Sequence, residues 1–442
     1  MGRRPKNKTI IKKRGKVKPP QLLRGMKDII PQEQDYWNFV RDAARKIAQE
    51  YGFKRIETPI LENSTLFVRA TGKHTDIVEK EMFSFTDQGG EKVCLKPEAT
   101  PGIVRAYIEH GMLNLPQPVK LYTISPLFRR ERPQSGRTRQ HHQFDLEIIG
   151  DKNSVIEGQL LLIAYKFYKE IGINIKIKIN SLGCVECSPR YKENLVSYLK
   201  GKRTKLCPDC KKRLAKNPLR ILDCKEEKCK AISAEAPQIV DWLCENCKDH
   251  FTKVLEYADD LSIPYELDPC LVRGLDYYTK TVFEIFPEHS EHSNRRQNAL
   301  GGGGRYDDLI YDFGGKDTPA CGMGLGIERA IVQLKENRIE INKKQDFEIF
   351  VAQLGEKARV KALELFENLR QIGIKTAENF SKGSLRSQLE LANKLGVKAT
   401  LIIGQKEVLD KTILVRDMES GIQEEVDFSK AISEVKKILK KK

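Results

Sequence analysis

The sequence predicts an α+β fold on an antiparallel sheet, with a helical insertion inside it and a small α/β domain at the C-terminus. Three observations support this prediction. Strand patterns before residue 150 return at Leu271–Phe286 and Ala320–Gly326 with few helices between them, which favours antiparallel pairing. The segment 181–264 is rich in Lys and Cys and mostly helical in pattern. After Gln345, short strands alternate with helices, which is typical of an α/β module.

Apolar residues at helical spacing predict an amphipathic helix at 32–50. They are Tyr36, Phe39, Val40, Ala43, Ala44 and Ile47. The other elements predicted up to residue 179 are an extended segment at 53–61, a strand at 92–97, a helix at 101–110, strands at 120–129 and 141–149, a helix at 156–171 and a strand at 173–179.

The C-terminal part is predicted to fold as a domain of its own. Residues 331–344 form the end of a helix and a polar linker, and residues 345–442 form the α/β domain. Its strands are predicted at 347–354, 374–377, 399–404 and 412–416, and its helices at 356–372 and 384–395.

Length and composition indicate an ordinary globular protein. The chain has 442 residues, of which 40% are hydrophobic, enough for two or three domains with normal cores. It has no run of about 18 apolar residues and no apolar segment near its start, so we expect neither a membrane span nor a secretory signal. A soluble cytoplasmic protein is the expectation.

A basic tail accounts for about half of the net charge of +17. Residues 1–18 contain nine Lys or Arg and no acid, and we predict that residues 1–20 are disordered. The tail could contact RNA phosphates non-specifically, or it could be a solubilising extension. An organellar transit peptide is a third, weaker option, because the tail is Lys-rich and nearly free of Ser.

The segment Phe128–Gly150 carries the strongest functional signal. Its second strand places Gln143, Asp145 and Glu147 on one face and apolar side chains on the other, as expected for the floor of a pocket. The preceding loop is dense in guanidinium groups, which suits a nucleotide phosphate chain, although a solvated hairpin is the alternative. The loop arginines are Arg129, Arg130, Arg132, Arg137 and Arg139.

Three segments resemble the motifs of class II aminoacyl-tRNA synthetases in the form seen in histidyl-tRNA synthetases. Residues 128–150 resemble motif 2, LVRGLDYYTKTVFE (271–284) resembles the histidine-binding signature, and GMGLGIERAIVQL (322–334) resembles motif 3. GSLRSQLELANKLGVKATLIIG, within the C-terminal domain, is similar to the anticodon-binding domain of several class II synthetases.

The resemblance implies a histidine–tRNA ligase. Residues 21–330 would then be the class II catalytic domain, interrupted by the insertion, and residues 345–442 the anticodon-binding domain. The implied substrates are histidine, ATP with Mg²⁺, and tRNA(His). A homodimer is implied as well, since residues 32–67 resemble the motif 1 region of the family.

The resemblance assigns three arginines to ATP and to the reaction. Arg129 would grip the α-phosphate, and Arg273 would be a second cation at the reacting centre. Arg329 would reach the far phosphates and stack near adenine. An arginine in an amphipathic helix is often only a surface residue, but the glycines at 322, 324 and 326 just before it allow close ligand approach and favour the binding role. No GxxxxGK[ST] motif or Rossmann GxGxxG motif is present, which disfavours P-loop and dinucleotide folds.

Polar and aromatic side chains are assigned to histidine by the same resemblance. Glu98, Thr100 and Gln143 would bind the ammonium group. A neutral imidazole has one donor and one acceptor, so an acid and a hydroxyl suit it, and Glu147 and Tyr278 resemble that pair. Tyr277 and Tyr306 would line the same wall. All three tyrosines could instead be ordinary core aromatics, but their occurrence together with Arg273 and Arg305 favours the pocket.

The sequence departs from the family pattern at a few positions. Ala99 stands where Gly is usual, Lys96 replaces an Arg, and Asp145 occupies a position that is often small or apolar. An extra glycine extends the GGR loop. None of these changes removes a ligand that the resemblance assigns.

Three other functions are weighed against the ligase. A regulatory relative from histidine biosynthesis would lack the C-terminal domain and commonly the Arg signature, and this chain keeps both. The RGLDYY signature argues against prolyl, threonyl or glycyl transfer. The polar stripe argues against a plain RNA-binding protein.

Eight of the eleven cysteines form four close pairs. Cys184/Cys187 and Cys207/Cys210 are separated by 19 residues, which is zinc-ribbon-like spacing, and Cys224/Cys229 with Cys244/Cys247 repeat it approximately. Two structural tetrathiolate sites, each formed from pairs consecutive in sequence, are one interpretation. Plain reduced thiols are the other. No metal-ligating residue is assigned at the catalytic site.

Overall fold

The computed structural model describes residues 19–73, 75–131, 138–288, 299–341, 346–381 and 383–440. The chain divides into two compact units, residues 1–341 and residues 342–442. The predicted basic tail, apart from its last two residues, lies outside the described residues, as do Arg132, Arg137 and residues 342–344 of the predicted linker.

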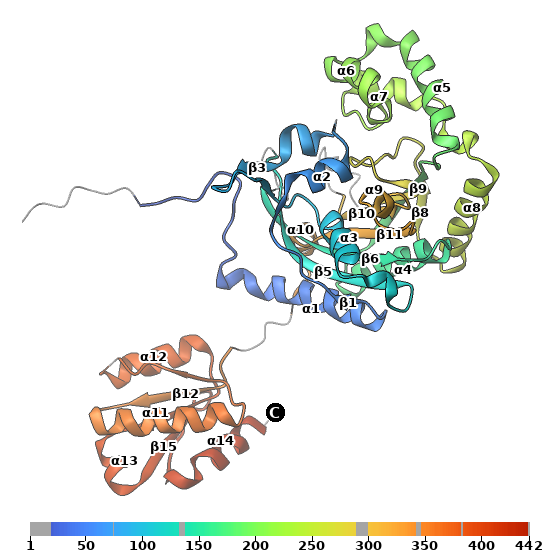
Figure 1. Ribbon diagram of the computed structural model, residues 1–442. Coiled ribbons are helices and arrows are strands. Elements are labelled where there is room, and N and C mark those ends of the chain that lie inside the picture. The colour runs from blue at the N-terminus through green and yellow to red at the C-terminus, as the bar shows by residue number, and fades with distance from the viewer. Residues whose placement is uncertain are drawn as a thin grey trace, which may run out of the picture. The chain divides into compact units, whose positions relative to one another are not determined.

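Unit 1 is built on an eight-stranded sheet with the order β1-β5-β6-β11-β10-β9-β7-β8 (Figure 1). All neighbouring strands are antiparallel except the outermost pairs, β1 with β5 and β7 with β8, which are parallel. The strands are β1 (Lys54–Arg55), β5 (Val119–Phe128), β6 (Gln140–Ile149), β7 (Ile175–Ser181), β8 (Tyr265–Leu267), β9 (Thr279–Pro287), β10 (Gly301–Arg305) and β11 (Ala320–Gly326).

Helices cover the apolar face of this sheet. Phe144, Leu146 and Ile148 of β6 are fully buried in one core cluster with side chains of the covering helices. Full burial of one such side chain stabilises the fold by roughly 1.5–3 kcal/mol, so exposing this face to water would destabilise the fold. The helices are α1 (Gln34–Glu50), α4 (Val155–Glu170), α8 (Glu245–Asp260) and α10 (Ile327–Glu336).

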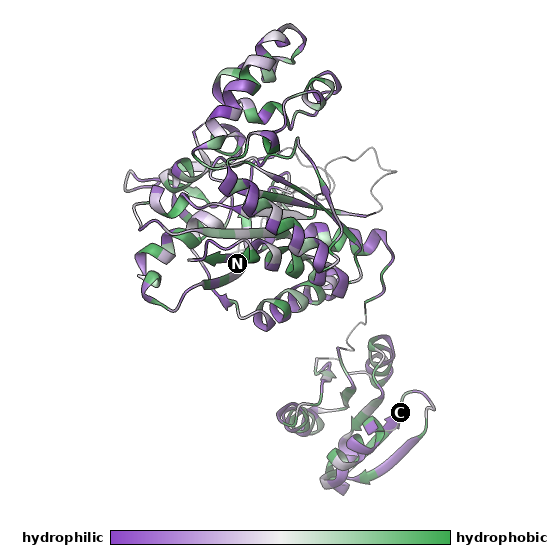
Figure 2. Ribbon diagram, turned by 90° about the vertical axis from the view of Figure 1, so that its right-hand side faces the viewer, coloured by the Kyte–Doolittle hydropathy of each residue, from purple (hydrophilic) through white to green (hydrophobic). Residues whose placement is uncertain are grey.

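The other face of the sheet carries the polar stripe. Around it lie a three-stranded sheet and three shorter helices (Figure 1). These elements are β2 (Leu61–Asn63), β3 (Phe83–Thr86), β4 (Lys92–Leu95), α2 (Ser64–Thr71), α3 (Thr100–Glu109) and α9 (Leu309–Asp312), with a π-helical turn η2 (Ile77–Glu81) and a 3₁₀ turn η3 (Met112–Asn114). The helices show apolar residues on one side and hydrophilic residues on the other along their length (Figure 2).

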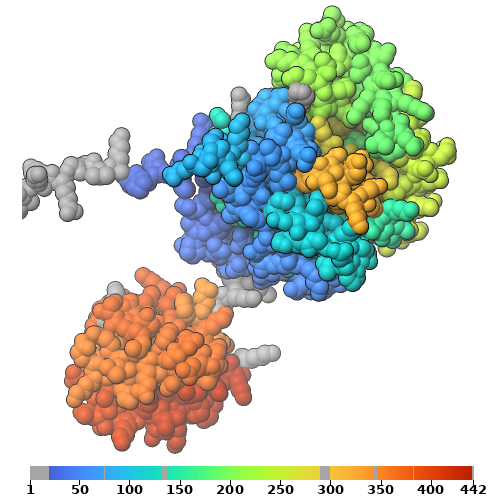
Figure 3. Space-filling model, in the orientation of Figure 1, coloured from blue at the N-terminus to red at the C-terminus, as the bar shows by residue number. Residues whose placement is uncertain are grey.

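The insertion leaves the sheet after β7 and returns through α8 to β8. It forms a lobe of unit 1 that stands out in the space-filling view (Figure 3). Before α8 it contains α5 (Cys187–Gly201), α6 (Pro208–Lys216) and α7 (Glu227–Ala234), with 3₁₀ turns η4 (Arg203–Lys205), η5 (Pro218–Ile221) and η6 (Ile239–Trp242).

The predicted pairing of the cysteines is wrong. The structure groups Cys184 and Cys187 with the last pair, Cys244 and Cys247, and it groups the two middle pairs with each other. The lobe folds back on itself, so its first and last cysteines meet. Pairs that are consecutive in the sequence are therefore not the ones that come together.

One predicted strand is shorter than expected. The strand predicted at Leu271–Phe286 begins only at Thr279, because Leu271–Tyr278 leaves the sheet and contributes side chains to the site instead. The strand β10 had not been predicted, because four of its five residues are glycine.

Unit 2 has a five-stranded sheet with the order β13-β12-β14-β15-β16. Strands β13 and β14 both run parallel to β12, whereas β15 is antiparallel to both of its neighbours, β14 and β16. The strands are β12 (Ile349–Gln353), β13 (Thr376–Glu378), β14 (Ala399–Ile403), β15 (Thr412–Asp417) and β16 (Gln423–Asp427). The helices are α11 (Glu356–Gln371), α12 (Leu385–Leu395), α13 (Gln405–Asp410) and α14 (Ala431–Lys440).

No helix among the described residues combines the length and the apolar character that crossing a membrane would need.

Candidate active site

The floor of the site is the polar face of β6. Gln143, Asp145 and Glu147 lie on this face at alternate positions, as the sequence predicted. On one side they pair with Gly326, Gly324 and Gly322 of β11, and on the other with Ser125, Thr123 and Leu121 of β5. The stripe is therefore bordered by glycines on one side and by small hydroxyl side chains for most of the other.

The glycines keep the floor clear for these acids. A Cβ at Gly322 would overlap Glu147 Oε2, and one at Gly324 would lie 2.6 Å from Asp145 Oδ1. In β10, a Cβ at Gly302 would lie 2.6 Å from Arg273 Nη1. The close approach of polar side chains to the sheet thus requires glycine at these positions.

Glu147 accepts hydrogen bonds at both oxygens. The Thr100 hydroxyl, at the start of α3, donates to Glu147 Oε1 at 2.6 Å, and the Tyr306 hydroxyl donates to Oε2. Glu147 and Tyr306 are each 1% exposed. Thr100, which the sequence assigned to the ammonium group, thus sits directly beside the carboxylate assigned to the imidazole.

Glu98 lies on the segment between β4 and α3. The Tyr277 hydroxyl donates to Glu98 Oε2 at 2.9 Å. Tyr277 also packs against Tyr278 and Tyr306, with ring centroids 4.6 and 5.7 Å away. The three predicted tyrosines therefore form one aromatic wall, and two of them hold the two acids.

Burial raises the pKa of both acids toward neutrality. It raises the pKa of Glu98 to about 7, although the nearby Arg129, the Tyr277 hydroxyl and Arg273 lower it. Burial likewise raises the pKa of Glu147 to about 7, against the Thr100 and Tyr306 hydroxyls. The pKa of Asp145 is raised well above its usual value by burial and by the Glu147 charge. Such an acidic, desolvated stripe favours a cationic ligand.

Arg273 stands over the aromatic wall. Its Nη1 donates to Glu284 Oε1 of β9 at 2.6 Å, and its guanidinium carbon lies 5.6 Å from the centre of the Tyr278 ring. Arg273 and Arg129 both lie close enough to Glu98 to lower its pKa, so the two predicted catalytic cations flank one carboxylate.

The other two candidates for binding phosphate follow shortly after a strand of the sheet. Arg129 follows β5 and donates from Nε to Pro97 O at 2.8 Å. Arg329 is the third residue of α10, and its Nη1 donates to Ala299 O. A Cβ at Gly326 would lie 3.3 Å from Arg329 Cδ, so Arg329 borders the Gln143 end of the stripe.

Several buried polar atoms along the site have no hydrogen-bond partner within the described part of the chain. They are Glu98 Oε1, Thr123 Oγ1, Ser125 Oγ, Asp145 Oδ2 and Arg273 Nε. Buried polar groups in native proteins are nearly always paired, so these atoms indicate a ligand or ordered water over the stripe.

Two residues differ from what the sequence suggested. Arg305, which appeared to support the pocket, points to the opposite face of β10 and forms a two-pronged ion pair with Glu157 at 2.7 and 2.6 Å. Glu328 was missed. It accepts from the backbone and ring nitrogens of His142 and so fixes the strand beside Gln143.

Comparisons with known proteins agree with this geometry. A family model described as histidyl-tRNA synthetase matches residues 25–330, and a model described as an anticodon binding domain matches residues 348–438. A curated histidine–tRNA ligase of Dehalococcoides mccartyi is 43% identical over 418 residues, which is 94% of this chain and 99% of that protein.

The chain belongs to the histidyl-tRNA synthetase family. A histidine–tRNA ligase of Caldanaerobacter subterraneus subsp. tengcongensis is 42% identical over 94% of this chain and 98% of that protein. The crystal structure of apo histidyl-tRNA synthetase from S. aureus matches with a TM-score of 0.78 and 33% identity, over 95% of this chain and 100% of that one. The predicted class II fold, with its C-terminal anticodon-binding domain, is confirmed, and the chain is an aminoacyl-tRNA ligase.

Proposed function

We propose that the chain joins histidine to ATP with release of pyrophosphate, and then transfers histidine to the 3′ end of tRNA(His). One observation carries this proposal. Two buried carboxylates, Glu98 and Glu147, lie against the same aromatic wall, each is held by a tyrosine hydroxyl of that wall, and two arginines stand beside the first. Such a site offers acids for a cationic amino acid next to cations for a phosphate.

Histidine would bind through its two polar ends. Its ammonium group would meet Glu98 and Gln143, where Glu98 Oε1 is an acceptor that lacks a partner within the described residues. Its imidazole would lie toward Glu147, which can accept an N–H, and toward the Tyr278 hydroxyl. Asp145, between Gln143 and Glu147, adds a third acid that suits a ligand with two basic groups.

The arginines would supply the charge that the reaction needs. Joining a carboxylate to the α-phosphorus brings two anions together, so fixed cations lower the barrier. Arg129 would hold the α-phosphate and Arg273 the developing negative charge, while Arg329 would reach the outer phosphates. ATP would enter as its Mg²⁺ complex, since Mg²⁺ takes oxygen ligands mainly from phosphates and water.

The second unit would bind the tRNA. Within it, a surface hollow combines the apolar side chains Leu385, Leu389 and Met418 with Arg416 and with Arg386, which pairs with Glu390. Apolar surface beside cations suits stacked bases and backbone phosphates.

We further assign the activity to a cytoplasmic homodimer. Family membership in translation supports the location. Exposed apolar side chains at Ile60 and Leu61, 44% and 47% exposed, lie within the motif 1 region and support a subunit contact. Light scattering coupled to size exclusion would give twice the chain mass, and a monomer at micromolar concentration would contradict the dimer.

An ATP–pyrophosphate exchange assay with each amino acid in turn tests the proposed activation. Exchange should depend on histidine and on Mg²⁺. Robust exchange with proline, threonine or glycine but not histidine would reassign the substrate. Absence of exchange with every amino acid would favour a regulatory relative or a plain RNA-binding protein.

A further inference from the structure

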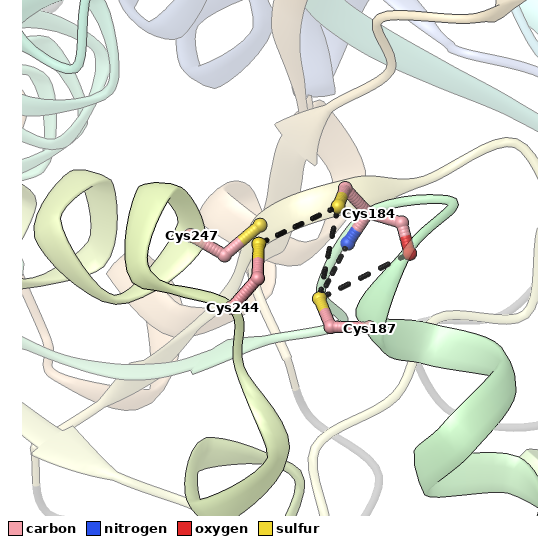
Figure 4. A group of neighbouring side chains, drawn as sticks. All are labelled: Cys184, Cys187, Cys244 and Cys247. Atoms are coloured by element: carbon pink, nitrogen blue, oxygen red, sulfur yellow. Dashed lines mark hydrogen bonds between the residues drawn. The ribbon is translucent and has the colours of Figure 1, made fainter.

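Eight cysteine sulfurs gather into two compact groups in the insertion. The outer cluster consists of Cys184, Cys187, Cys244 and Cys247, and the inner cluster consists of Cys207, Cys210, Cys224 and Cys229. Within each cluster all four sulfur atoms lie within 4.8 Å of one another. Figure 4 shows the outer cluster, with two cysteines from α8 facing two from the loop and first turn of α5.

The spacing of the sulfurs matches a single tetrahedral ion. Four thiolates at about 2.3 Å from a zinc ion lie about 3.8 Å from one another. The Sγ atom of Cys184 is 3.7 Å from that of Cys187 and 3.8 Å from that of Cys244. In the inner cluster the sulfurs of Cys207 and Cys224 are 3.9 Å apart. A disulfide would hold two sulfurs at about 2.0 Å.

The backbone around both clusters donates hydrogen bonds to the sulfur atoms, as a set of metal-bound sulfurs would require. In the outer cluster, the Cys184 N–H donates to Cys187 Sγ at 3.2 Å. In the inner one, the Cys207 N–H donates to Cys229 Sγ at 3.3 Å and the Cys210 N–H to Cys207 Sγ at 3.4 Å. Four sulfurs also sit at the positive N-terminal ends of helices, which offsets the negative charge of a tetrathiolate site. These are Cys187 in α5, Cys207 at α6, Cys229 in α7 and Cys244 at α8.

We propose that each cluster binds one structural Zn²⁺ through its four cysteines. Four sulfur ligands in a tetrahedron select zinc or iron among common metals, and a closed site without an open position suits zinc in a structural role. Neither site has a place for a substrate. The inference is independent of the proposed ligase activity.

The two ions would do different things in the lobe. The outer ion would join the segment that leaves β7 to the start of α8, and so clamp the two ends of the insertion. The inner ion would hold α6, α7 and the segment that follows the turn η5 together. That part of the lobe touches the catalytic domain, because Arg213 and Asn217 contact Asp76 and Asp276 at 3.1 and 2.8 Å.

The backbone of Gly183 lies directly against the outer cluster. Its φ is +69°, which favours glycine, and a Cβ there would lie 2.6 Å from Cys187 Sγ. At Gly201, the last residue of α5, an added Cβ would meet no other atom within 4 Å. Gly183→Ala should therefore disturb the outer site alone, and Gly201→Ala provides a matched control.

Metal analysis of the full chain, purified without chelator, tests the proposal. We expect about two zinc ions per chain, about one after Cys184→Ser with Cys187→Ser, and about one after Cys207→Ser with Cys210→Ser. The control Cys94→Ser with Cys270→Ser should keep both ions, because neither cysteine belongs to a cluster. Gly183→Ala should lose the outer zinc ion and keep about one per chain, while Gly201→Ala should keep both.

A second measurement covers variants that fail to fold. The native wild-type chain is titrated with a thiol-reactive mercurial while a dye reports free zinc. The concentration of free zinc should rise in proportion to the number of the eight cluster thiols that have reacted. Less than about 0.2 zinc per chain with all eight thiols freely reactive would overturn the proposal, as would iron in place of zinc or disulfides found by mass spectrometry.

Discussion

Two arginines of unit 1, Arg273 and Arg305, differ in what surrounds them. Arg305 is fully buried, and its hydrogen bonds go to Glu157, Asp307 and two backbone carbonyls. Arg273 donates a hydrogen bond to Glu284, and its buried Nε lacks a hydrogen-bond partner within the described residues. A guanidinium with unused N–H donors can bind a ligand, whereas a guanidinium whose donors are all used can only stabilise the fold.

This contrast gives opposite expectations for the two alanine variants. Arg273→Ala should lower kcat for adenylate formation by about 10²–10³-fold with little change in the histidine KM, because the charge acts mainly in the transition state. Arg305→Ala should lower the free energy of unfolding by about 3–5 kcal/mol, because it leaves Glu157 buried without its main partner. Steady-state kinetics and urea unfolding on both variants separate the roles. A loss of less than about threefold in kcat for Arg273→Ala would remove it from the reacting centre.

The raised pKa values of the two acids predict how stability changes with pH. Glu98 has a pKa of about 7 when folded, against an ordinary value of 4.5. Between these values the folded state keeps a proton that the unfolded state has lost, so stability falls as pH rises through this window. Glu98→Gln mimics the protonated acid and should therefore gain stability relative to wild type on going from pH 5 to pH 8.

Urea unfolding at both pH values measures this difference. Glu193→Gln, on an exposed position of α5, is the control and should track wild type. If the free energies of unfolding of wild type and Glu98→Gln differed by the same amount at pH 5 and at pH 8, Glu98 would not be held protonated in the folded state.

The sequence predicted the acids of the site better than it predicted their surroundings. Strict alternation in β6 was enough to place Gln143 and Glu147 on one face. It could not show that Arg305 faces α4, because the glycine-rich β10 has no side chains from which to infer its register. Glu328 was missed because its partner, His142, is 186 positions away in sequence.

At the scale of single elements, β11 is as important to the site as β6. Its glycines are paired in register with the polar residues of β6, and they set how near the acids lie to the sheet. The sequence signalled these glycines as permitting close ligand approach. What they accommodate first is the side chains of the neighbouring strand.

Gly322→Ala should therefore weaken histidine binding. The added methyl group would displace Glu147 from the Tyr306 hydroxyl. Loss of a hydrogen bond to a charged group costs about 1.5–3 kcal/mol, so the histidine KM should rise about 10- to 100-fold while the ATP KM stays the same. Gly201→Ala is the control with open space around it. An unchanged histidine KM for Gly322→Ala would show that Glu147 does not contact histidine.

At the scale of the whole molecule, the two units have separate cores. Unit 1 has clusters around β6, around α3 and in the insertion, and unit 2 has clusters on both faces of its own sheet. Hydrophobic periodicity predicted most of these elements within a few residues. The pairing of the cysteines could not be predicted, because sequence spacing does not say how a helical lobe folds back.

Deleting residues 345–442 should leave adenylate formation largely intact and lower tRNA charging by about tenfold or more, because separable units carry separable binding energy. Parallel assays of pyrophosphate exchange and tRNA charging test this expectation. Equal loss of both activities would mean that the catalytic unit needs the second unit in order to fold or to dimerise.

The central claim is that the stripe on β6 selects histidine for activation. Rapid-quench, single-turnover measurement of aminoacyl-adenylate on the full chain tests it most directly, since it isolates the chemical step from product release. With histidine and Mg²⁺-ATP, we predict close to one adenylate per active site, formed at least about 10²-fold more slowly in Arg273→Ala. Adenylate formed from proline or threonine at the rate seen with histidine, or none from histidine with ATP bound, would contradict the claim.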